Sequence, residues 1–272
     1  MRIGVVAPAG RLQRETAERF VAFASARRPD VTIDLHPQCY LSHGHFAGTD
    51  EERLEAFVAF ANDPAFDAIW FARGGYGSNR IAAAAVERLN KHARDKTYLG
   101  YSDLGYMLAA LYKAGFPHVA HGPMPQGISH DDGAEAVARG LGWLADRDTA
   151  CVEPSLEPGV PVAAFNLTVL GTLLGTQLEP DLAGHVLMIE DVGEMAYRID
   201  RAMSHLTGQP SMRRLRGIRA GRFDPVPDND PPFGETPVEI VQAWCDSAGI
   251  PFLGTADIGH DAANKVVPFG TP

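Results

Sequence analysis

Ser102 lies where a short strand is expected to turn sharply into a helix. Residues 99–105 read Leu-Gly-Tyr-Ser-Asp-Leu-Gly, and the expected strand ends at Gly100. A serine hydroxyl at such a turn is exposed at the carboxyl end of a sheet, beside free helical N–H groups and the positive end of the helix dipole. These groups stabilise negative charge, so the position suits a nucleophile. A serine can equally cap a helix here, and Gly105 comes one position too late for the Gly-x-Ser-x-Gly pattern.

A glycine-rich segment follows another expected strand. Residues 73–78 read Arg-Gly-Gly-Tyr-Gly-Ser, and glycines let backbone N–H groups approach a phosphate or an oxyanion closely. The segment is neither Gly-x-Gly-x-x-Gly nor a lysine-bearing phosphate loop. Taken alone, it is also consistent with a plain tight turn between a strand and a helix.

His260 follows Gly259 after a later strand, and acidic side chains precede it at Glu190, Asp191 and Glu194. A serine hydrolase needs a base and a carboxylate that orients the base. The order Ser102, Glu190, His260 matches the order serine, acid, histidine of some α/β enzymes. A single histidine is more often a surface or buried structural residue, so the order by itself decides nothing.

The histidine-rich segments do not have metal-ligand spacing. His43 and His45 lack a third ligand at diagnostic distance along the chain, as does His130 with the two aspartates after it. We therefore expect no metal and no cofactor.

Composition excludes several classes of function. The 272 residues are 45% hydrophobic and 21% charged, as in soluble globular proteins, and the formal net charge is −10. A chain this acidic, without a basic block, is not expected to bind nucleic acid or an anionic membrane. No apolar run is long enough to span a bilayer or to form a signal peptide, and the three cysteines form no disulfide framework. We expect a cytoplasmic protein.

The first half of the chain alternates strands with helices, which predicts a parallel sheet covered on both faces. Strands are expected at residues 3–7, 31–35, 66–71 and 97–100, and helical patterns at 11–27, from 50 onward, at 81–89 and at 104–113. Turn formers in 153–159 mark a boundary. Beyond it we expect strands at 185–189, 217–223 and 251–254 and helices at 197–206 and 238–247.

Taken together, the segments resemble the LD-carboxypeptidase family of serine peptidases, which includes the microcin C immunity peptidases. The most specific strings are Arg-Gly-Gly-Tyr-Gly at 73–77, Gly-Tyr-Ser-Asp at 100–103 and Tyr-Arg-Ile-Asp-Arg at 197–201. Further matches occur in order over nearly the whole chain, at 5–10, 46–53, 121–124, 166–170, 189–192, 259–260, Asn264 and Pro268.

The resemblance implies two domains: an α/β domain that carries the nucleophile, and a smaller, β-rich domain of barrel-like form. We place them at residues 1–150 and 166–272, with a linker at 151–165. By position, Ser102 is then the nucleophile, His260 the general base and Glu190 the acid that orients it, with Glu194 as the rival acid.

The resemblance also assigns a role to the glycine loop. The oxyanion hole is expected to be the backbone N–H groups of Asp103 and Gly75, because a side chain at Gly75 would keep the backbone away from the tetrahedral oxygen. Arg73, Gly74 and Tyr76 are expected to bind substrate.

Family members typically cleave the amide between an L-configured centre and a terminal D-amino acid, and they release D-alanine from the cytoplasmic murein tetrapeptide. We therefore expect a small muropeptide as substrate, and a homodimer. One alternative is an immunity-type amidase that cleaves a peptidyl-nucleotide antibiotic, which would need an aromatic platform from Trp70, Trp143 or Trp244. The other is a non-catalytic binding protein that has kept the fold. Phe165 stands where a glycine commonly precedes Asn-Leu in the family, which is expected to reshape the pocket.

Overall fold

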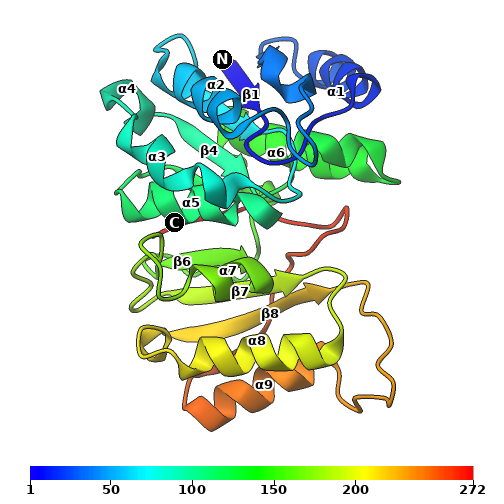
Figure 1. Cartoon of the computed structure of the whole chain (residues 1–272), viewed down its shortest axis with the longest axis vertical. Helices are drawn as coiled ribbons and strands as arrows, with labels where there is room; N and C mark the ends of the chain where they lie inside the picture. The colour runs from blue at the N-terminus through cyan, green and yellow to red at the C-terminus, as the bar shows by residue number, and fades with distance from the viewer. Residues whose placement is uncertain (272) are drawn as a thin grey trace.

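Two sheets, one built mainly from each half of the chain, organise residues 1–271, which the computed structural model describes (Figure 1). The first sheet has the strand order β10-β5-β4-β3-β1-β2, and all its pairs are parallel except β10 with β5. Its strands are β1 (Arg2–Val6), β2 (Thr32–Leu35), β3 (Ala68–Phe71), β4 (Thr97–Gly100), β5 (Val119–His121) and β10 (Val267–Pro268).

Helices cover both faces of this sheet, because its central strands are apolar on both sides. Successive strand residues point to opposite faces, so Val5 packs with one helix layer and Val6 with the other. The layer beside Val5 holds α1 (Arg14–Arg27) and α6 (Gly133–Asp146). The layer beside Val6 holds α2 (Asp50–Asn62), α3 (Ala82–Glu87), α4 (Lys91–Arg94) and α5 (Gly105–Lys113).

The second sheet has four parallel strands in the order β6-β7-β8-β9. The strands are β6 (Val162–Asn166), β7 (Val186–Asp191), β8 (Gly217–Phe223) and β9 (Phe252–Thr255), and the helices are α7 (Leu167–Leu173), α8 (Ala196–Gly208) and α9 (Pro237–Ala248). Figure 1 shows α8 and α9 side by side along β8.

The mixed α/β architecture with two domains, predicted from the sequence, is confirmed. The second domain differs in detail from the barrel-like form that we expected. Parallel neighbours need crossover connections, and here each crossover contains a helix. The sheet is open, because the strand order leaves β6 and β9 at its two edges.

The C-terminal tail joins the two sheets. After β9 the chain returns to the first sheet, where β10 pairs with β5. Gly270 then exchanges two backbone hydrogen bonds of 2.9 Å with Val162 of β6. Strand β6 begins at Val162, inside the segment 151–165 that we predicted as a linker. The residue limits of the two domains stay a prediction.

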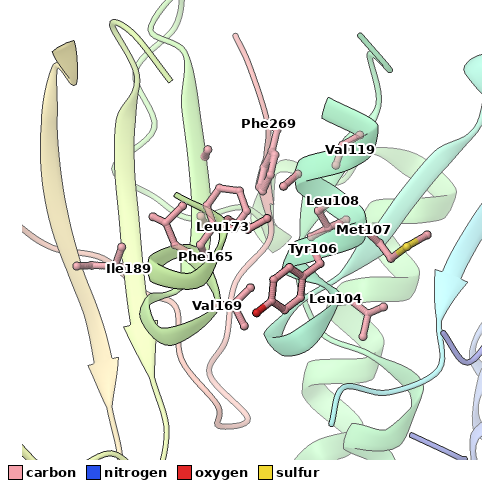
Figure 2. Close-up of a cluster of buried hydrophobic side chains, with 14 of the residues drawn as sticks. Leu104, Tyr106, Met107, Leu108, Val119, Phe165, Val169, Leu173, Ile189 and Phe269 are labelled. Atoms are coloured by element: carbon pink, nitrogen blue, oxygen red, sulfur yellow. The ribbon is translucent and has the colours of Figure 1, made fainter. Parts of the chain in front are cut away.

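Apolar side chains fill the junction between the domains. Figure 2 shows α5 facing α7, with Tyr106 directed toward Val169. The Phe165 and Phe269 rings lie 5.1 Å apart, and a Cβ at Gly105 would come within 2.9 Å of Val169. Each fully buried large apolar side chain contributes roughly 1.5–3 kcal/mol, so this packing fixes one domain against the other. Phe165 belongs to this core at the domain junction, and its effect on the pocket stays a prediction.

Candidate active site

Ser102 occupies a strained turn between β4 and α5. It begins the short 3-10 helix η3 (Ser102–Leu104) and has a φ of 61°. Among residues 1–271, only Asp132 and Arg147 share a positive φ outside glycine. Such a conformation costs on the order of 1–3 kcal/mol and persists where the surrounding structure imposes it, often at functional sites. The turn predicted for this serine is present.

Three side chains that are distant in sequence form one hydrogen-bonded chain. His260 Nε2 lies 2.9 Å from Ser102 Oγ, and His260 Nδ1 lies 2.5 Å from Glu190 Oε2. Glu190 is in β7, whereas His260 is in the loop that follows β9. A carboxylate at Nδ1 keeps the proton on that nitrogen, which leaves Nε2 free to accept the proton of the serine hydroxyl.

Glu190 and His260, the two ionisable groups of this hydrogen-bonded set, affect each other's pKa. Glu190 is fully buried, and burial raises the pKa of its carboxyl, against the opposing effect of His260. Burial alone would lower the pKa of His260, but the adjacent Glu190 carboxylate, with smaller contributions from Asp191 and Asp261, outweighs burial and raises that pKa. Glu190 Oε1 has no hydrogen-bond partner among the residues that the structure describes. His260 is therefore the main group that offsets the cost of burying the Glu190 carboxylate. Because the pKa of His260 is raised, its imidazole is a stronger base than usual.

Glu194 is not part of the hydrogen-bonded set Ser102–His260–Glu190. Gly193 turns the backbone with a φ of 72°, and Glu194 lies 3.5 Å from Arg198, one turn along α8. The structure thus brings Glu190 to His260, and Glu194 pairs with its helix neighbour.

Asp191, beside Glu190, has a structural role that the sequence analysis did not assign. Its carboxylate accepts hydrogen bonds from Asn166 Nδ2 (2.7 Å), from the backbone and hydroxyl of Thr168 (3.0 and 2.8 Å) and from the Val192 N–H (2.9 Å). Asn166 in turn caps α7 through Val169. These bonds fix the end of β7, from which Glu190 projects. The sequence offered one signal for this arrangement: Asn166 stands at the start of an expected helix, where asparagine is a common capping residue.

The glycine loop lies directly against the serine. A Cβ at Gly74 would come within 2.9 Å of Ser102 Cβ and Oγ, so only glycine fits there. At Gly75 a Cβ would make only ordinary contacts with Gly10, at 3.6 and 3.7 Å, and the constraint is instead its φ of 108°. Gly74, not Gly75, is therefore the position where a side chain would push the loop from the serine. Gly75 requires glycine because L-residues rarely adopt its backbone conformation.

Asp103 ties the glycine loop to the turn that carries Ser102. The buried Asp103 carboxylate accepts a 2.9 Å hydrogen bond from the Ser78 N–H, and the Ser78 hydroxyl donates to the Asp103 carbonyl at 2.6 Å. The N–H of Asp103 is in the first turn of η3, where no preceding turn supplies an acceptor. This places an available N–H immediately after the serine.

The other predicted binding residues lie on the same loop. Arg73 is half-buried, and its guanidinium donates to the Arg11 carbonyl at 3.2 Å. Tyr76 is 49% exposed, with its ring 6.1 Å from that of Phe46. Arg73 and Tyr76 thus place a cation and an aromatic surface on the loop next to Ser102.

The hollow beside His260 is small. It measures about 40 Å³, and its lining includes Tyr101, Met124, His260 and Asn264. A much larger pocket of about 810 Å³ lies at the amino end of β5, lined in part by Trp143 and Arg147. The chemistry-bearing residues are not in the larger pocket, so cavity size does not locate the site.

No group of three or more His, Cys, Asp or Glu side chains within residues 1–271 is arranged to hold a metal ion. None of the helices described in that range is long and apolar enough to cross a membrane.

The fold and its match to known families define a two-domain α/β peptidase. The family models for the N-terminal and C-terminal domains of LD-carboxypeptidase match residues 3–122 and 161–272. The chain belongs to the LD-carboxypeptidase family.

Individual relatives cover nearly the whole chain. A Synechocystis sp. relative is 31% identical over 278 residues, covering 99% of this chain and 89% of its own. The murein tetrapeptide carboxypeptidase of Pseudomonas aeruginosa is 26% identical over 291 residues, covering 99% and 91%.

Solved structures show the same fold. Muramoyltetrapeptide carboxypeptidase from Oxalobacter formigenes superposes with a TM-score of 0.81 at 22% identity, covering 99% of this chain and 93% of that one. The microcin C7 self immunity protein MccF, solved in complex with aspartyl sulfamoyl adenosine, also gives 0.81, at 20% identity and with 99% and 91% coverage.

Proposed function

We propose that the protein is a serine carboxypeptidase that hydrolyses the amide between an L-configured centre and a terminal D-amino acid. The hydrogen-bonded chain Ser102–His260–Glu190 carries this proposal. Its three members come from two domains and meet with the distances that a nucleophile, its base and an orienting acid require.

In the first half of the reaction, Ser102 Oγ attacks the scissile carbonyl carbon while His260 Nε2 takes its proton. The N–H groups of Asp103 and Gly75 donate hydrogen bonds that stabilise the negative charge on the carbonyl oxygen. His260 then donates its proton to the leaving amine, and the terminal D-amino acid departs. This leaves an acyl ester on Ser102.

In the second half, His260 removes a proton from water, and the resulting hydroxide attacks the ester. Collapse of the tetrahedral intermediate returns the proton to Ser102. Glu190 stabilises the imidazolium in both halves, because its buried carboxylate faces Nδ1.

The substrate proposed is the murein tetrapeptide, with D-alanine as the product. The name of the Pseudomonas aeruginosa relative, which nearly spans this chain, supports this choice. The test is to incubate the purified protein separately with the tetrapeptide and with an aminoacyl sulfamoyl adenosine. We expect D-alanine and tripeptide from the first and no cleavage of the second. Cleavage of the nucleotide analogue alone would contradict the proposal.

The tryptophans do not favour the peptidyl-nucleotide alternative. Trp70 is fully buried and donates to the Pro123 carbonyl. Trp244 donates to Asp200 between α9 and α8, and Trp143 stacks on Arg147 at the end of α6. None of the three lines the hollow beside His260 in the described part of the chain.

The pH dependence of kcat/KM follows from the pKa of His260. Only the neutral imidazole can accept the serine proton, so activity should rise with pH through the pKa of this group. Since the Glu190 carboxylate raises that pKa, the acidic limb should lie above the ordinary histidine value of about 6.5. In Glu190→Gln the residual activity should have its limb at lower pH, because the largest contribution that raises the pKa of His260 is lost while burial still lowers it. An unchanged limb in that variant would exclude His260 as the titrating group.

A further inference from the structure

His260 lies on a loop of the second domain, whereas Ser102 belongs to the first, so something must fix the loop relative to the serine. On the side of the second domain, Arg222 of β8 pairs with Asp257 and Asp261, which flank the histidine. The backbone N–H of Arg222 also donates to the Ile258 carbonyl at 2.8 Å. These contacts hold the loop to its own sheet, but they do not set its distance from Ser102.

Asn264 connects the loop to the first domain. Its side chain is buried, and Oδ1 accepts the Gly259 N–H at 3.2 Å and faces His121 Nε2 at 3.2 Å. Since Gly259 N–H can only donate, the atom facing it is the amide oxygen. The same oxygen then requires a donor from His121, which places the ring proton on Nε2. Asn264 thus joins the residue before His260 to a histidine 143 positions away.

His121 shares a strand edge with the serine. It ends β5 and is the register partner of Gly100 on β4, two residues before Ser102. The Gly122 N–H donates to the Gly100 carbonyl at 3.0 Å, which fixes the two strand ends together. Through Asn264, the backbone at His260 is therefore positioned from the same sheet edge that carries the nucleophile.

Three further observations agree with this connection. Burial lowers the pKa of His121 to about 3, so the ring is neutral and carries a single proton, which the contact with Asn264 Oδ1 places on Nε2. Arg139 of α6 donates to the Asn264 carbonyl at 3.1 Å and to the Ala262 carbonyl, so a second contact from the first domain holds the loop. The Tyr101 ring lies between His121 and His260, with centroids 5.5 and 4.9 Å away.

We propose that His121 and Asn264 are positioning residues, which fix the base His260 relative to Ser102 across the domain junction. This inference rests on the proposed function. Neither residue touches the reacting atoms, and their effect on the rate is through the placement of the imidazole.

The test compares Asn264→Ala with a control that removes another hydrogen bond between the domains. Tyr112 of α5 bonds to His185 Nε2 at 2.6 Å, and that bond does not lead to the loop of His260. Because a displacement of about 1 Å can cost about 100-fold in rate, Asn264→Ala should lower kcat by about that factor with little change in KM. Tyr112→Phe should lower Tm but leave kcat near the wild-type value.

The rate at which diisopropyl fluorophosphate modifies Ser102 provides a second readout, which needs no substrate binding. It should fall in Asn264→Ala and stay unchanged in Tyr112→Phe. If the wild type releases no D-alanine, the proposed function fails, while this readout still tests the positioning of His260.

A pair of His121 variants covers the case in which Asn264→Ala does not fold. His121→Gln keeps an N–H donor near the position of Nε2 and should retain most of kcat and of the Ser102 modification rate. His121→Leu keeps the bulk but loses the donor, and both rates should fall. Equal rates in these two variants, or an Asn264→Ala rate no lower than that of Tyr112→Phe, would overturn the proposal.

Discussion

Ser102→Ala is expected to lower kcat for D-alanine release by at least about three orders of magnitude while both domains remain folded. Removal of a nucleophile from such a triad typically costs this much or more, because the steps that depend on its oxygen are lost. The fold should survive, since alanine has the same conformational strain as serine at a φ of 61°. The measurements are the rate of D-alanine release and the thermal unfolding temperature.

Ser129→Ala provides the matched control for this prediction. Within residues 1–271 the hydroxyl of Ser129 bonds only inside its own turn, to Gln126, so this variant should keep wild-type kcat. Full activity in a folded Ser102→Ala protein would remove the basis for a serine mechanism.

Glu190→Gln is expected to lower kcat by about 10⁴-fold, whereas Glu194→Gln should change it only a few-fold. An amide at position 190 keeps the shape but loses the charge that stabilises the imidazolium and selects its tautomer, and a loss of about that size is typical for this change. Glu194 pairs with Arg198, which is 53% exposed in its side chain, and such surface pairs contribute about 0–1 kcal/mol. Steady-state kinetics of the two folded variants makes the comparison.

The reverse ranking of these two variants would assign the acid to Glu194. The contact between Ser102 and His260 would be unaffected by that outcome, because it does not involve either glutamate.

The strands that were predictable from the sequence are those whose side chains are buried on both faces. Within the expected strand, residues 68–71 form a continuous apolar run because β3 lies in the middle of the first sheet with helices on either side. In contrast, β5 has only three residues, which is too short for a periodic signal. Strand β6 follows a segment rich in proline, which concealed it in the expected linker. The pairing of β10 with β5 depends on the return of the tail across the junction, which no local pattern encodes.

In the site, too, features set by neighbouring residues were predictable, whereas features set by contacts between distant residues were not. The turn at Ser102 is local and was predictable, and Glu190 was preferred over Glu194 because of its position in the family resemblance. The requirement for glycine at position 74 arises from contact with Ser102, 28 positions away, and therefore needs coordinates. The connection from His121 through Asn264 was hidden for the same reason, although both residues lay in segments that carried the resemblance.

The most direct measurement for the serine mechanism is the site of covalent modification by diisopropyl fluorophosphate, followed by peptide mass spectrometry and D-alanine release on the same samples. The reagent needs a hydroxyl that is activated by a neighbouring base, and His260 Nε2 lies 2.9 Å from Ser102 Oγ. We expect one adduct, on Ser102, whose extent matches the fraction of activity lost at every time point. A fully modified Ser102 with activity retained, or activity lost with the adduct on another residue, would contradict the account.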